Sequence, residues 1–252
     1  MSATFFSPHR QRGFTLIEIM IAMLIALFLL AGLGTLVAGT RRTGTNQIAL
    51  AQLQDEERLA MSILTDVIQN AGTYDTTKYY TAQDGLPAVA AGTVPAMAQG
   101  QGITGTHSTA LPGDTIVVRY GTASGDGVMN CTGGTNTSGT STTYTNYFFI
   151  LVTGSQTQLR CSPSGAATGI ALVDNVANMQ IYYGVVTAGG TMTSVDTYMT
   201  ANQLTASNWM NVTSARVTLA FINPLAGQPG QNPYVFFTRV IPIQPRAGAV
   251  FP

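Results

Sequence analysis

The feature that most constrains this chain is an apolar run close to its start. From Ile19 to Ala38 there are 20 residues without a formal charge. Twenty residues in a helix rise about 30 Å, which is the thickness of the hydrocarbon core of a bilayer. Basic residues flank the run evenly, with Arg10 and Arg12 before it and Arg41 and Arg42 after it, so charge alone does not fix its orientation. The run predicts a membrane-spanning helix.

Two kinds of segment fit such a run, an uncleaved anchor and an ordinary secretory signal. A secretory signal has an apolar region of about 7–15 residues and ends at a small-residue cleavage site. This run is longer, and no A-x-A site ends it. Charged residues make up only 9% of the chain and balance to a net charge of zero, against about 25% charged residues in soluble proteins. These values argue against a basic nucleic-acid-binding domain and a highly charged cytosolic enzyme.

Glu18 is the residue that does not fit a plain anchor, because it lies between Ile17 and Ile19. Inserting a carboxylate there costs about 3 kcal/mol or more, and a charge within a span is a functional hypothesis by default. The simpler alternative is that Glu18 lies near the membrane interface and snorkels.

The residues around Glu18 resemble a type IV prepilin signal, with a basic leader, Gly13, Phe14 and then TLIEIMIAM. The resemblance implies that a prepilin peptidase cuts between Gly13 and Phe14 and that the new Phe14 amine is N-methylated. The ammonium of Phe14 then needs a counter-charge, which Glu18 of a neighbouring subunit supplies. Removing one member of a buried ion pair costs about 3–5 kcal/mol, so we expect Glu18 to act in subunit assembly.

Helical spacing continues beyond the apolar run and is expected to stop at Gly72. Glycines in the middle of this helix each cost about 1 kcal/mol relative to alanine, so we expect local softness or a bend there. They are Gly32, Gly34, Gly39 and Gly44. The apolar stripe of the second half is formed by Leu50, Leu53, Ala60, Leu64, Val67, Ile68 and Ala71.

Beyond the helix, residues 83–113 are rich in Gly, Ala and Pro and are expected to form a long loop. The period then changes to two, which predicts strands. They cover residues 114–120, 146–153, 156–161, 178–186, 214–223 and 234–243. A hairpin turn is expected between the second and third. The predicted fold is α+β and pilin-like, with one long N-terminal helix packed on an antiparallel β-rich globular head.

Later segments resemble the PilW family of minor pilins. They are RLAMSILTDVIQNAGTYD, LVDNVANMQIYYGVV and VTSARVTLAF, with the lone Trp209 before the last. Two features depart from the family pattern. Thr73 separates the AG pair from Tyr74, and VVTAGGTM after Gly184 lacks the acidic residues that the family often carries. The second departure argues against a bound cation in that loop.

Cys131 and Cys161 flank the predicted hairpin, and their even number in an exported chain favours a disulfide over two free thiols. Closing a 30-residue loop contributes about 3–4 kcal/mol by the chain-entropy estimate. No metal site is expected, because neither His9 nor His107 has ligand-like neighbours. The aspartates of the head, Asp114 among them, are isolated along the chain, and no nucleotide-binding or hydrolase motif occurs. We therefore expect no enzyme activity and no cofactor.

Aromatic residues form a last group, for which a recognition surface and half-buried strand positions are the two interpretations. They are Tyr79, Tyr80, Tyr182, Tyr183 and Trp209. Half-buried strand positions are the more common outcome.

Four parts follow: a leader over 1–13, a transmembrane and assembly helix over 14–40, an amphipathic helix over 41–72 and the head over 73–252. The resemblance implies a structural minor pilin that helps to initiate a type IV pilus and joins it at or near the tip, with roles in twitching motility, adhesion and DNA uptake. The partners that the resemblance implies are prepilin peptidase, other minor pilins, the major pilin and a tip-associated adhesin. It would lie in the bacterial inner membrane with a periplasmic head, then in the pilus. The alternatives are a J-type pseudopilin of a type II secretion system and an anchored binding or enzymatic domain with a similar leader.

Overall fold

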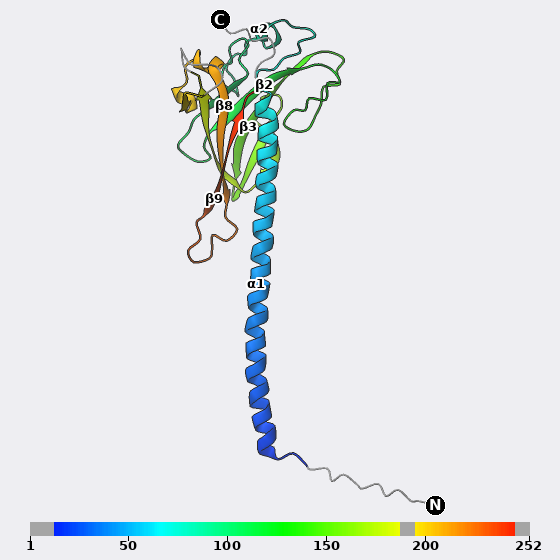
Figure 1. The fold of residues 1–252 in the computed structure, drawn as a ribbon, viewed down its shortest axis with the longest axis vertical. Coiled ribbons are helices and arrows are strands. Elements are labelled where there is room, and N and C mark those ends of the chain that lie inside the picture. The colour runs from blue at the N-terminus through cyan, green and yellow to red at the C-terminus, as the bar shows by residue number, and fades with distance from the viewer. Residues whose placement is uncertain (1–12, 187–194, 245–252) are drawn as a thin grey trace, which may run out of the picture. The chain divides into compact units, whose positions relative to one another are not determined.

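The structure, a computed structural model, describes residues 13–186 and 195–244. Its first element is helix α1, Leu16–Gln69, which contains 54 residues (Figure 1). Helix α1 continues through all four glycines that were expected to weaken it, without an interruption. It ends where the sequence predicts, because Gly72 has a φ of +80°, a conformation open to glycine. The Gly72 N–H donates to the Arg119 carbonyl at 2.9 Å.

The chain forms two compact units, one ending at Ala49 and the other beginning at Leu50. The second unit contains the end of α1 and the whole head. A short helix, α2 (Ala82–Gly85), follows α1. Two short 3-10 helices, Ala201–Gln203 and Asn208–Asn211, precede β8.

Two antiparallel sheets build the head (Figure 1). The first is a meander in the order β1-β2-β3-β4-β5. Its strands are β1 (Ile103–Thr106), β2 (Thr115–Thr122), β3 (Thr142–Thr153), β4 (Gln156–Ser162) and β5 (Ile170–Asp174). The second has the order β7-β6-β8-β9. Its strands are β6 (Val176–Val185), β7 (Thr197–Met199), β8 (Val212–Ile222) and β9 (Tyr234–Pro242).

All six predicted strands are present, and the β3–β4 hairpin turns at Gly154 as expected, with Thr153 opposite Gln156. Three described strands were missed, β1, β5 and β7, which have only four, five and three residues. The prediction that 83–113 is all loop is wrong, because β1 lies within it. Strand β1 has only four residues, one of them a glycine, so its apolar and polar residues alternate too briefly to predict a strand. It is a strand because its backbone pairs with β2.

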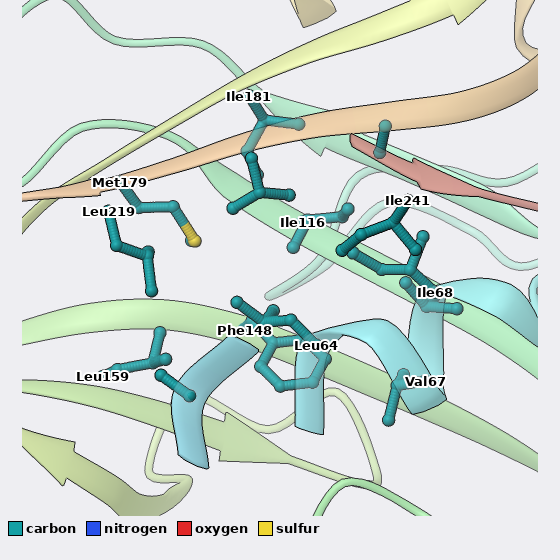
Figure 2. Close-up of a cluster of buried hydrophobic side chains, with 14 of the residues drawn as sticks. Leu64, Val67, Ile68, Ile116, Phe148, Leu159, Met179, Ile181, Leu219 and Ile241 are labelled. Atoms are coloured by element: carbon teal, nitrogen blue, oxygen red, sulfur yellow. The ribbon is translucent and has the colours of Figure 1, made fainter. Parts of the chain in front are cut away.

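The core of the head is filled by α1 and both sheets together. Figure 2 shows Leu64 of α1 beside Phe148 of β3 and Ile68 of α1 beside Ile241 of β9. Leu219 of β8 belongs to the same cluster of buried apolar side chains. The predicted stripe of α1 is buried from Leu53 onward, whereas Leu50 is 36% exposed and Met61, which was not predicted, is fully buried. The helix thus closes the two sheets around one apolar interior.

Candidate processing and assembly site

The predicted processing and assembly residues lie together at the start of α1. Gly13 and Phe14 precede the helix, and the side chain of Phe14 is 81% exposed. Glu18 lies in the first helical turn, and its Oε2 accepts from the backbone N–H and the hydroxyl of Thr15, both at 3.3 Å. A carboxylate here satisfies a helix N-terminal donor and lies at the positive end of the helix dipole. Glu18 therefore has a local partner in the single chain and remains accessible to another.

The helix that follows Glu18 is long and apolar enough to cross a membrane, and none of its apolar window is buried. Leu24, Leu30 and Leu36 are all more than 60% exposed. The polar groups within it are satisfied internally, since the hydroxyls of Thr35 and Thr40 donate to carbonyls one turn back at 2.8 and 3.0 Å. Both features suit a segment surrounded by lipid or by other helices.

In the head, Cys131 and Cys161 form the predicted disulfide, with a Cα–Cα distance of 6.3 Å. Cys161 belongs to β4, and Cys131 lies in the loop that precedes β3. Both side chains are buried. The fully buried Asn146 of β3 supports the same loop, because its Oδ1 accepts from the Cys131 N–H at 2.9 Å. The disulfide therefore attaches the loop to the β3–β4 hairpin.

Asp114, isolated in the sequence, lies in a buried hydrogen-bonded cluster. Its Oδ1 accepts from Ser108 N–H and contacts His107 Nδ1, both at 2.9 Å, and its Oδ2 accepts from Ile181 N–H at 2.7 Å. The carboxylate therefore joins the start of β2 to β6 of the other sheet. Among the described residues, no group of three or more His, Cys, Asp or Glu side chains is placed to hold a metal ion. The segment 187–194, expected to lack a cation site, lies outside the described residues.

Arg119 of β2 is a second buried residue whose importance the sequence did not reveal. It is 1% exposed. Its guanidinium donates to the carbonyls of Gln101 at 2.8 Å, Ala98 at 3.0 Å and Leu86 at 3.4 Å, and also to that of Pro87. Burial lowers the pKa of Arg119 to about 10, so the group stays charged at neutral pH. This one side chain therefore hydrogen-bonds to four backbone carbonyls within residues 83–113, the segment expected to be a long loop.

The aromatic group divides into buried and exposed members. Tyr183 and Trp209 pack edge to face in the core with ring centroids 4.8 Å apart. Tyr182 is half-buried on the outer face of the second sheet, where the Arg216 guanidinium lies 4.7 Å from its ring centroid. Tyr80, in contrast, is 93% exposed. The interpretation as half-buried strand positions is right for Tyr182. It is wrong for Tyr79 and Tyr80, which lie outside any strand, and for Tyr183 and Trp209, which are buried.

Comparisons with protein families agree with this arrangement. Residues 8–34 match the prokaryotic N-terminal methylation motif, which covers Gly13, Phe14 and Glu18. Residues 146–236, from β3 into β9, match the family described as type IV pilus-assembly protein W, PilW. No curated protein and no solved structure matches the chain significantly. The chain therefore carries a prepilin-type methylation motif at its start and a region of the type IV pilus-assembly PilW type over residues 146–236 of its head.

Proposed function

We propose that this protein is a minor pilin that helps to initiate a type IV pilus and is incorporated at or near its tip. The observation that carries the proposal is the carboxylate of Glu18 in the first turn of an exposed apolar helix, inside the methylation motif. Over residues 14–40 every apolar side chain of this helix is exposed, so this part needs lipid or other helices around it. A carboxylate at its end needs a cation in the same environment.

Processing supplies that cation. In this proposal, prepilin peptidase cleaves after Gly13, and the methylated amine of Phe14 carries the charge. As subunits leave the inner membrane, Glu18 of one subunit exchanges Thr15 for the Phe14 ammonium of a neighbour. The pair sets the axial register between subunits, because leaving either charge unpaired in low dielectric costs about 3–5 kcal/mol. The partners are other minor pilins, the major pilin and a tip-associated adhesin, and the role is structural rather than enzymatic.

The substitution Glu18→Ala tests this function. It removes a charge from an apolar segment, so membrane insertion stays intact. Association with partner pilins falls by about 100-fold or more, because 1.4 kcal/mol corresponds to a factor of ten. Asp55→Ala is the control, since it also removes a carboxylate but from an exposed site on the same helix.

The measurements are the amount of protein in the inner membrane, co-purification with the partner pilins, and piliation. We expect Glu18→Ala cells to have few or no pili and to accumulate the subunit in the membrane, whereas Asp55→Ala cells resemble wild type. Normal complexes and normal piliation with Glu18→Ala would show that Glu18 is not an assembly residue here. Deletion of the gene separates the two filament systems, because loss of protein secretion with normal pili would indicate a type II secretion pseudopilin instead.

A further inference from the structure

The outer edge of β9 is a long strand edge with unused hydrogen-bonding groups. Strand β9 ends the second sheet and pairs only with β8. Two flanking bonds fix which groups face β8: Ile243 N–H to Thr213 O at 2.8 Å and Asn223 N–H to Pro233 O at 2.9 Å. Because narrow and wide pairs alternate in an antiparallel ladder, the odd-numbered residues of β9 bond to β8. The N–H groups of Tyr234, Phe236, Thr238 and Val240 therefore point away from the sheet.

One face of β9 packs against the core of the head. Phe237 packs edge to face on Phe221 with ring centroids 5.7 Å apart, and Ile241 is fully buried against the core (Figure 2). On the opposite face, Phe236 is 65% and Val240 50% exposed. The outer edge is thus open over residues 234–240, with Phe236 and Val240 exposed on one face of the strand.

Other strand edges in the described part of the head are short or covered. Edge strands β1, β5 and β7 have at most five residues. Strand β6 extends beyond β7, and there its backbone is occupied: Met179 N–H donates to Pro112 O, Met179 O accepts from Asp114 N–H, and Ile181 N–H donates to the Asp114 carboxylate. Natural proteins protect long open edges because such edges pair with other chains. Among the described residues, no strand pairs with the outer edge of β9.

We propose that β9 receives a β-strand from the head of a partner pilin, which extends the second sheet across the subunit boundary. This inference rests on the proposed function, because it assigns one contact of the assembled complex. The outward N–H groups over residues 234–240 can pair only with an extended backbone. The partner segment is therefore a strand of about seven residues, roughly 23 Å long. Its alternate side chains beside Phe236 and Val240 are apolar.

Charge selects a different protein over a second copy of this one. Strand β9 carries one charged residue, the exposed Arg239, and no acidic residue. Pairing two β9 strands edge to edge would place the two Arg239 side chains on the same face of the joined sheet, and like charges that close are destabilising. A partner strand with an acidic residue near Arg239 complements this charge.

Hydrogen exchange of full-length wild-type protein tests the proposal. Peptides covering 234–242 are compared between the detergent-solubilised subunit and pili recovered from cells. The outward amides should exchange fast in the free subunit and about 100-fold more slowly in the pilus. Unchanged exchange in pili that contain the protein overturns the strand pairing. Slow exchange of the outward β9 amides in the free subunit also overturns the proposal. If that subunit is monomeric, another part of the same chain covers the edge; if it is dimeric, two copies of β9 pair with each other. Absence of the protein from pili refutes the proposed function, and this pairing with it.

Two substitutions at one position isolate the backbone group. Thr238→Pro removes an outward N–H, whereas Thr238→Val keeps it and removes the hydroxyl that contacts Thr218 at 2.8 Å. We expect Thr238→Pro to fold but to be depleted from pili by about tenfold or more, and Thr238→Val to be incorporated normally. Equal incorporation of both variants contradicts the proposal. If Thr238→Pro does not fold, the exchange measurement on wild type decides.

Discussion

Replacing Arg119 by methionine should destabilise the head more than replacing any exposed arginine, because the side chain holds four backbone carbonyls in the core. Those carbonyls belong to Leu86, Pro87, Ala98 and Gln101. A hydrogen bond to a charged group contributes about 1.5–3 kcal/mol. Removing the buried cation also removes its desolvation cost, which offsets part of this sum. We expect a net loss of about 3–5 kcal/mol in the free energy of unfolding.

Urea unfolding measures this loss, because Trp209 is the single tryptophan and is 8% exposed beside Tyr183. A loss of this size also lowers the melting temperature by about 6–20 °C for a head of this length. Arg160→Met is the matched control. Arg160 is only half-buried and donates to one backbone carbonyl, that of Gly169, so we expect a loss of about 1 kcal/mol. Equal effects of the two substitutions, or a loss below about 1 kcal/mol for Arg119→Met, would refute the reasoning.

Two further predictions concern the head. Asp114→Ala leaves the N–H groups of Ile181 and Ser108 without their acceptor, so urea unfolding should show a loss of about 3 kcal/mol in the free energy of unfolding. Asp114→Asn keeps one acceptor and should lose about half of that. A loss for Asp114→Ala no larger than for the exposed Asp126→Ala would contradict this role. The Cys131–Cys161 bond should leave no titratable thiol without reductant, and the double substitution to alanine should cost about 3–4 kcal/mol; two free thiols per chain would contradict the disulfide.

Features with a local or periodic pattern could be predicted from the sequence. The spacing of Leu53, Leu64 and Ile68 identified the buried face of α1, and Gly72 its end. Alternating apolar residues identified the long strands, and cysteine count and context identified the disulfide. Glu18 was found because a carboxylate in an apolar run contradicts its surroundings.

The rest could not be predicted because the partners are backbone groups from distant segments. The bonds of Arg119 cross up to 33 positions in the chain, and that of Asp114 to Ile181 crosses 67. A carbonyl or an N–H has no residue-type signature, so neither contact leaves a pattern in the sequence. The strands β1 and β7 were missed for a related reason, since three or four residues become a strand only through pairing with a neighbour.

The most direct test of the account is the mass of the mature protein's N-terminal peptide. We expect the chain purified from cells to begin at Phe14, its amine to carry a methyl group, and Gly13 to stay attached when prepilin peptidase is lost. A mature chain that begins after Ala38 would indicate an ordinary signal peptide, with Glu18 removed, and would contradict the prepilin account.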